Sequence, residues 1–144
     1  MIRYDLFDNG SLLIVRFTGI IDKSDIISFI EYIFPKTDSD SLNRILCDFR
    51  EAESTFSPNE IEDIANVQAL YDKGQYKVKE VFLVKNPENT MLATLYTLKF
   101  KNWILLVCST TRYCINQFSL SINDQELENM LESLKYEFHK SNAS

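Results

Sequence analysis

The sequence is poor in the residues from which common catalytic sites are built. Its 144 residues include only 3 Gly, 3 Pro and 1 His. Glycine-rich phosphate loops, histidine-based metal sites and histidine-dependent triads therefore lack their material. Cys47, Cys108 and Cys114 are odd in number and form no CxxC pair, so neither a disulfide framework nor a zinc site is indicated, and we expect core thiols. We predict no enzyme activity, no cofactor and no bound metal.

Long apolar runs and a positive net charge are also absent. The longest apolar run, residues 103–108, is far shorter than the roughly 18 residues that cross a bilayer. Arg3, Asp5 and Asp8 interrupt the first apolar stretch, which therefore lacks the pattern of a secretion signal. A net charge of −6 disfavours nucleic-acid binding, because phosphate contacts need a concentrated positive surface. We expect a cytoplasmic protein with no membrane span and no nucleic-acid partner.

What is present is the composition of one globular domain, with 45% apolar and 25% charged residues. Asn9-Gly10 between two β-rich runs predicts an opening hairpin. Three apolar runs that alternate with helical patterns predict interior strands at 44–49, 78–85 and 103–108. The order ββαβαβαβα, with an added C-terminal helix, predicts a single α/β domain over residues 1–144. Its sheet is expected to be mixed, mainly parallel and five-stranded, with helices on both faces.

Capping residues predict where the helices begin. The predicted caps are Asp22 or Ser24, Ser57, Asn86, Ser109 or Thr110, and Asn123. The second helix is expected to run from Ser57 to about Lys73. The last helix, 124–139, has a regular apolar face from Leu127 to Phe138 and carries the only histidine, His139, in its last turn. That face could pack on its own sheet or on a second subunit, so a homodimer through this helix is one hypothesis.

Asp48 ends the first interior strand, on the sheet edge where loops of α/β proteins usually carry function. A phosphoacceptor aspartate of the receiver type would need further carboxylates and a lysine on a later strand end, yet Ser109 follows the strand that ends at Cys108. We therefore expect Asp48 to pair with Arg50 or to bind loop backbone. An enzyme would have to use Asp48 and Glu51, and we rank that interpretation third.

Ser57 is the more informative residue of this edge. It is a predicted N-cap, with Pro58 at the first helical position and Glu60 placed to complete a capping box. A phosphate there would meet the exposed N–H groups of the helix start, but also the acidic residues of the first turn, so the two effects oppose. Ser54 and Thr55 offer hydroxyls nearby. An unmodified cap remains the simpler role for Ser57.

Several segments resemble the STAS family, the fold of sulfate transporters and anti-sigma factor antagonists, and in particular its small stand-alone bacterial members. The segments are residues 17–22, 45–50, 81–84 and 107–110. In the family, a strand leads to an Asp-Ser-Ser-Gly helix start whose first serine is phosphorylated in the antagonists. Ser57 matches that serine, whereas Phe56 and Asn59 replace the aspartate and the glycine. The resemblance extends to about Leu120, so the last helix is an addition.

The resemblance implies a non-catalytic regulatory or protein-interaction domain. We predict that it binds a protein partner, a kinase or a regulator, through residues 49–63. The candidate residues are Ser57, Ser54, Thr55, Asp48 and Glu60. The alternative is a domain that binds a small molecule or lipid in an apolar pocket between sheet and helices, near Tyr71 and Tyr96.

Overall fold

The computed structural model describes residues 1–72, 74 and 77–140 of the chain. Its helices and strands within these residues, in chain order, are β1 (Ile2–Phe7), β2 (Leu12–Ile21), α1 (Lys23–Ile33), the 3-10 turn η1 (Phe34–Lys36), β3 (Arg44–Ser54), the 3-10 turn η2 (Pro58–Glu60), α2 (Ile61–Ala69), β4 (Lys79–Leu83), α3 (Pro87–Lys99), β5 (Ile104–Cys108), α4 (Thr111–Phe118), α5 (Asp124–Glu132) and β6 (Tyr136–Phe138).

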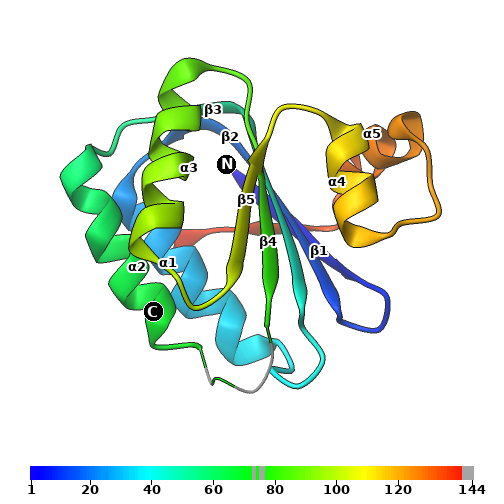
Figure 1. The fold of residues 1–144 in the computed structure, drawn as a ribbon, viewed down its shortest axis with the longest axis horizontal. Coiled ribbons are helices and arrows are strands. Elements are labelled where there is room, and N and C mark those ends of the chain that lie inside the picture. Colours follow the sequence, from blue (N-terminus) through cyan, green and yellow to red (C-terminus); the bar gives the residue numbers. More distant parts are fainter. Residues whose placement is uncertain (73, 75–76, 141–144) are drawn as a thin grey trace.

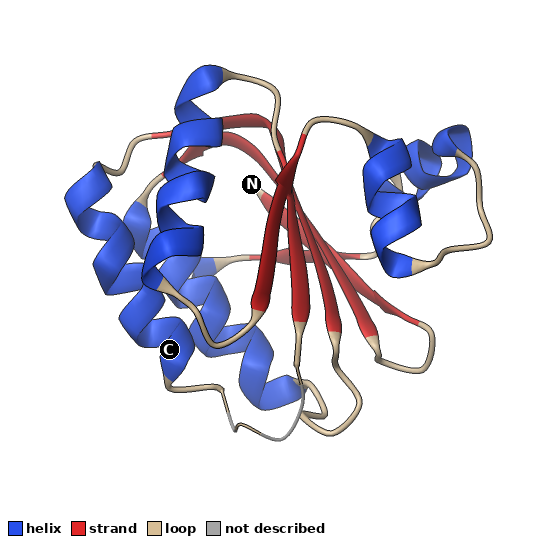
Figure 2. Cartoon of the chain, viewed as in Figure 1, coloured by secondary structure: helices blue, strands red, loops and turns tan. Residues whose placement is uncertain are grey.

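One six-stranded sheet runs through the molecule in the order β5-β4-β3-β2-β1-β6. Strands β2, β3, β4 and β5 run parallel to one another, and β1 is antiparallel to both β2 and β6. Figure 1 shows α1, α2 and α3 on one face of the sheet and α4 and α5 on the other. The three layers are also visible in Figure 2. The predicted α/β class with a mixed, mainly parallel sheet is confirmed.

Each face of the sheet has its own apolar core, and β3 contributes to both. Ile45 and Cys47 belong to the cluster under α1, α2 and α3, while Leu46 belongs to the cluster under α4 and α5. Successive side chains of a strand point to opposite faces, so a strand covered on both faces must be apolar at nearly every position. This is why the run from residue 44 was recognisable in the sequence.

The predicted strand number was wrong, and so was the extent of the last helix. The sheet has six strands instead of five, and α5 ends at Glu132 instead of residue 139. The following residues form β6, which pairs with β1 through Ile2↔Phe138 and Tyr4↔Tyr136. His139 therefore follows a strand rather than ending a helix, and its Nε2 lies 2.7 Å from Glu137.

Aromatic packing explains why β6 replaces the last turn of the expected helix. Tyr136 stacks on Tyr4 with ring centroids 5.4 Å apart, and Phe138 lies 5.4 Å from Phe29 and 5.1 Å from Tyr32. These contacts place the tail on an open sheet edge, where backbone groups need partners. The tertiary contacts outweigh the helical spacing that Phe138 shares with Leu134.

The apolar face of α5 is covered by the chain's own sheet. Leu127, Leu131 and Leu134 are almost fully buried in a cluster with Leu12 and Ile14 of β2. The dimer hypothesis depended on this face being available, and the fold buries its leucines and leaves only Met130 partly exposed.

The predicted hairpin and caps agree with the structure. Asp8 and Asn9 adopt φ of 53° and 58° in the turn between β1 and β2, the left-handed region that Asn and Asp tolerate. The observed N-caps include Asp22, Asn86, Thr110 and Asn123. The predicted end of the second helix, Lys73, lies outside the described residues, and α2 itself ends at Ala69. Within the described chain, no helix is both long and apolar enough to span a membrane.

Candidate functional site

The candidate edge of the sheet lies where β2 to β5 end, at the top of Figure 1. Its geometry is set by an irregularity in the pairing of β2 with β3. Arg16 pairs with Asp48 but Thr18 pairs with Glu51, so Phe17 faces two residues of β3, a β-bulge. β3 then continues to Ser54, well beyond the predicted strand end at Phe49. The predicted loop is therefore in large part strand.

Asn89, at the start of α3, satisfies the free side of this strand extension. β4 pairs with β3 only as far as Asp48, which leaves later carbonyl groups of β3 without a strand partner. The Asn89 Nδ2 donates to the carbonyl oxygens of Phe49 and Ala52 at 3.0 and 2.9 Å. Its Oδ1 accepts the hydroxyl of Ser54 at 2.6 Å. Ser54 is thus buried and bonded within the fold.

Ser57 lies on the surface, at the start of the second helical segment. Its backbone N–H donates to Oε1 of Glu60 at 2.9 Å, and the Glu60 N–H donates to the Ser57 carbonyl at 3.0 Å. Accepting the Ser57 N–H holds the pKa of Glu60 below its usual value. The preceding Phe56 is buried and anchors the loop from beneath. The start predicted from the sequence is confirmed, although its first turn is the 3-10 turn η2.

The acidic residues of this start are partly balanced by one lysine. Lys23 Nζ lies 3.0 Å from Oδ2 of Asp63 and 3.6 Å from Oε2 of Glu60. Its hydrogen bond with Asp63 raises the pKa of Lys23. Within the described residues, no group of three or more His, Cys, Asp or Glu side chains is arranged to hold a metal ion. The acidic cluster is therefore a surface of negative charge.

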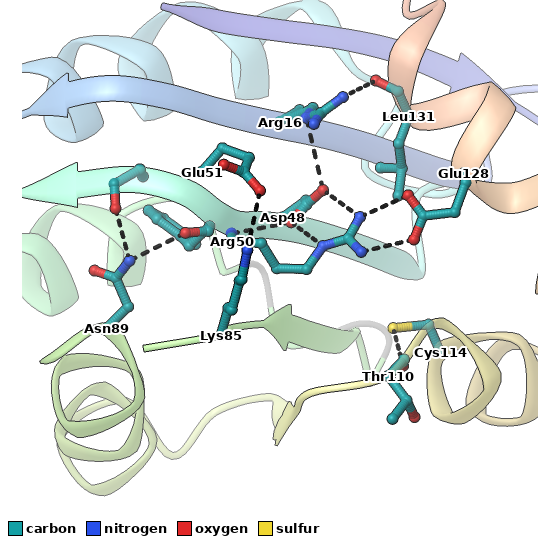
Figure 3. A network of polar contacts seen from close by, with 12 residues as sticks. Arg16, Asp48, Arg50, Glu51, Lys85, Asn89, Thr110, Cys114, Glu128 and Leu131 are labelled. Carbon is teal, nitrogen blue, oxygen red and sulfur yellow. Dashed lines mark hydrogen bonds and ion pairs between the residues drawn. The ribbon is translucent and has the colours of Figure 1, made fainter. Parts of the chain in front are cut away.

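Asp48 is bound in a network of ion pairs, shown in Figure 3. The carboxylate is 1% exposed. It accepts hydrogen bonds from Nε and Nη2 of Arg50 at 3.0 Å each, and from the Arg50 backbone N–H at 3.1 Å. Arg50 also donates to both oxygens of Glu128 on α5, at 2.6 and 3.0 Å. Arg16 Nε lies 3.8 Å from Asp48.

This network balances two carboxylates with two guanidinium groups. The hydrogen bonds that Arg50 donates to Asp48 and Glu128 raise the pKa of Arg50, and the bonds to Glu128 lower the pKa of that carboxyl group. Glu128 and Arg50 therefore both stay charged near neutral pH. The pairing of Asp48 with Arg50 that the sequence predicted is present, and it occupies the carboxylate on both oxygens.

A cavity of about 90 Å³ lies between the sheet and helices α1, α2 and α3. Its wall is almost entirely apolar, and Phe17, Phe49 and Phe82 of three adjacent strands contribute to it. Tyr96, which the sequence placed near such a pocket, also lines it, whereas Tyr71 lines a different, more polar depression. The cavity is therefore present, but its wall differs in part from the predicted one.

Five buried polar side chains line the cavity: Ser54 and Asn89, which bond each other, and Cys47, Gln68 and Glu80. The Cys47 thiol donates to Oε2 of Glu80 at 3.6 Å, while Oε1 of Glu80 and Nε2 of Gln68 have no partner. Burial raises the pKa of Glu80 to about 8, because desolvation disfavours the carboxylate. Burial likewise raises the pKa of the Cys47 thiol, in agreement with the inert core thiol that we predicted.

Comparisons with solved structures identify the fold. An uncharacterised protein of the DUF3478 family with a SpoIIAA-like fold, from Shewanella loihica, superposes with a TM-score of 0.55 and 10% sequence identity, over 81% of this chain and 92% of that one. This chain has a STAS-like fold. The anti-sigma factor antagonist SpoIIAA in its unphosphorylated form has a TM-score of 0.49 and 10% identity over 83% of this chain and 99% of its own. The phosphorylated form of the Bacillus SpoIIAA has a TM-score of 0.45 and 11% sequence identity, over 82% of this chain and 99% of its own.

No protein-family model matches the chain, and no curated protein is similar to it in sequence. At 10% identity, the likeness to solved structures establishes the STAS-like fold alone. Function must therefore be argued from the residues.

Within the STAS-like fold, the candidate residues from the sequence separate into two groups. Ser57 and Thr55 are exposed and Glu60 is partly exposed, whereas Asp48 and Ser54 are buried.

Sequence reasoning missed three residues that shape the edge and the cavity: Asn89, Glu80 and Glu128. Glu80 carried a signal, since it is a lone acid within an apolar strand. Glu128 carried none, because nothing in the sequence relates it to Arg50.

Replacing Arg50 with alanine tests the ion-pair network. The substitution leaves buried Asp48 without its main partner, and removal of one partner from a buried pair typically costs about 3–5 kcal/mol. We expect a loss of this size in the free energy of unfolding, measured by urea denaturation. Arg112→Ala is the matched control, because Arg112 and Asp124 form an exposed pair; it should change stability little. Equal effects of the two substitutions would contradict the structural role of Arg50.

The free energy of unfolding should decrease as the pH rises, because Glu80 is buried as a protonated carboxyl group. Its pKa is about 8 when folded and near 4.5 otherwise, so between these values the native state binds more protons than the unfolded state. The contribution of Glu80 is complete below about pH 4.5 and is lost at up to about 1.4 kcal/mol per pH unit as the pH rises towards 8. Glu80→Gln should remove this slope, whereas exposed Glu62→Gln should retain it. Urea unfolding at several pH values measures it, and identical slopes for wild type and Glu80→Gln would contradict the buried, protonated carboxyl group.

Proposed function

We propose that this protein is a non-catalytic regulatory domain that binds a protein partner through residues 49–63, with Ser57 at the centre of the surface. The observation that carries the proposal is the position of Ser57. It is an exposed serine at the helix start that follows β3, where the STAS resemblance places a phosphorylated serine. The STAS-like fold supports the same assignment.

The surface around Ser57 has features that suit a protein contact. Ile20 is 68% exposed, and it pairs with Glu53 on the neighbouring strand. Thr55 is exposed beside it, and its backbone N–H is fixed to the Ile21 carbonyl at 2.9 Å. An apolar side chain on a rigid, acidic edge favours a partner with an apolar contact surrounded by basic groups.

Phosphorylation of Ser57 would change this surface through charge. A phosphate adds close to two negative charges next to Glu60, whose carboxylate accepts the Ser57 N–H. Repulsion would displace Glu60 from the helix start, and Lys23, 3.6 Å from Glu60, would be released to pair with the phosphate. The unmodified and phosphorylated forms would thus present different charge and a different first turn to a kinase or regulator.

Substitutions at Ser57 test the proposal. We expect mass spectrometry of the protein from its native cells to find phosphate on Ser57. We also expect Ser57→Asp to lose at least one protein that co-purifies stoichiometrically with the wild type and with Ser57→Ala. Ser121→Asp, at another exposed serine, controls for added charge. No phosphate on Ser57, together with identical co-purifying proteins for all variants, would contradict the proposal.

A second candidate function is binding of a small molecule, and the cavity favours it. Burying a polar group without a hydrogen bond is unfavourable, yet the cavity contains the unpaired Oε1 of Glu80 and Nε2 of Gln68. A ligand with one hydroxyl group and an apolar body would satisfy both. At about 90 Å³ the space is smaller than an engineered cavity of roughly 150 Å³ that binds benzene. A lipid chain does not fit, so the small-molecule half of the alternative is the one that we retain.

Ethanol, which has one hydroxyl group and is smaller than benzene, is a suitable probe of this second candidate. We expect ethanol to cause saturable shifts in the amide signals of residues that line the cavity. Ala93→Phe, which adds a ring in the cavity wall, should abolish these shifts while the protein stays folded. Unchanged signals in the wild type, or equal shifts in both proteins, would contradict binding in the cavity.

A further inference from the structure

Two of the three cysteines lie in contact at the end of β5. Sγ of Cys108 and Sγ of Cys114 are 3.4 Å apart, and each lies within hydrogen-bond distance of the Thr110 carbonyl, at 3.7 and 3.5 Å. Cys108 ends the edge strand β5, while Cys114 lies in α4, which begins at Thr111. Thr110 and Cys114 are drawn in Figure 3. The sharp connection between strand and helix brings the two sulfur atoms together.

We propose that Cys108 and Cys114 form a redox-active thiol pair that hydrogen peroxide converts into an intramolecular disulfide. This proposal is independent of the partner-binding function and of the cavity. The sulfur atoms must approach from 3.4 Å to about 2.05 Å. Cys108 is half-buried, so peroxide can reach it, whereas Cys114 is fully buried behind it.

The surroundings make the two thiols unequal. The hydrogen bond between the two thiols lowers the pKa of Cys108, and the charge of Arg50 acts in the same direction. The same bond together with burial raises the pKa of Cys114. Because the thiolate is the nucleophile, Cys108 is the residue that attacks peroxide and Cys114 is the one that resolves the product.

The reaction has two steps, and its atoms and electrons balance. The Cys108 sulfur attacks one peroxide oxygen, so that an S–O bond forms, the O–O bond breaks and the other oxygen leaves as water after taking a proton. The sulfur of Cys114 then attacks the Cys108 sulfenic acid, so that the S–S bond forms, the S–O bond breaks and a second water leaves with the Cys114 proton. Two thiols are oxidised by two electrons, and one peroxide is reduced to two waters. A dithiol reductant reverses the product by exchange.

The third cysteine provides an internal control. Cys47 is buried and donates to Glu80, and no other sulfur atom is paired with it among the described contacts. We therefore expect it to stay reduced under the conditions that oxidise the pair.

Trypsin can identify the disulfide directly, because Arg112 lies between the two cysteines. Cleavage after Lys101, Arg112 and Lys135 places Cys108 and Cys114 on separate peptides, 102–112 and 113–135, while Cys47 lies on a third, 45–50. After treatment of the reduced full chain with hydrogen peroxide, we expect the first two peptides to remain joined until a reductant is added. The intact mass should fall by two hydrogen atoms, and the protein should stay at the same size on a non-reducing gel.

Single substitutions separate the two roles. Cys114→Ser should retain a Cys108 sulfenic acid that dimedone labels, and Cys108→Ser should leave Cys114 unreacted. Cys47→Ser should form the joined peptides at a rate within about twofold of the wild type. Circular dichroism of each reduced variant confirms that it is folded. The proposal is overturned if the wild type gives no joined peptides, if the joined peptides contain Cys47, if the link is between two chains, or if it forms only in denaturant.

Discussion

The bulge in β3 is the constraint on which the rest of the candidate edge depends. Two residues, Phe49 and Arg50, face the single Phe17 of β2. Before the bulge, Asp48 points to the face that α5 covers, where Arg50 links it to Glu128. Beyond the bulge, Ala52 and Ser54 are buried on the opposite face, where both bond Asn89 of α3. The extra residue shifts the alternation of faces by one position. A regular strand would have placed Ala52 and the Ser54 hydroxyl on the opposite face, away from Asn89.

Each polar group that the bulge buries has a partner from a helix that lies far away in sequence. Arg50 reaches Glu128 on α5, and Ser54 reaches Asn89 on α3. Unpaired buried polar groups are costly, so these contacts fix the edge at the same time as they occupy its side chains. Two reactive groups lie outside this network and are at least partly exposed: the hydroxyl of Ser57 and the thiol of Cys108 at the end of β5.

The elements of the fold could be predicted because their signals are local. Apolar runs marked the interior strands, and cap residues such as Asp22 and Asn123 marked helix starts. The sixth strand could not be predicted, because Phe138 fits the helical spacing of α5 and only its packing against Phe29 and Tyr32 shows otherwise. The helix start at Ser57 and the Asp48–Arg50 pair were also predictable, because each depends on residues that are close in sequence. The contacts of Asn89 and Glu128 bridge 35 and 78 residues, and no local pattern encodes such distances.

Phe56 connects the two candidate functions. Its side chain lines the cavity, while the next residue, Ser57, carries the exposed hydroxyl and the capping contact with Glu60. A ligand in the cavity would contact this ring from inside, and a phosphate on Ser57 would act on the same loop from outside. Coupling between two binding events is reciprocal. If the ligand and the phosphate both shift Phe56, the phosphate changes the affinity for the ligand by a certain factor. The ligand then changes the affinity of the loop for the phosphate's partners by that same factor. Phe56 therefore joins the exposed helix start at Ser57 to the core beneath it.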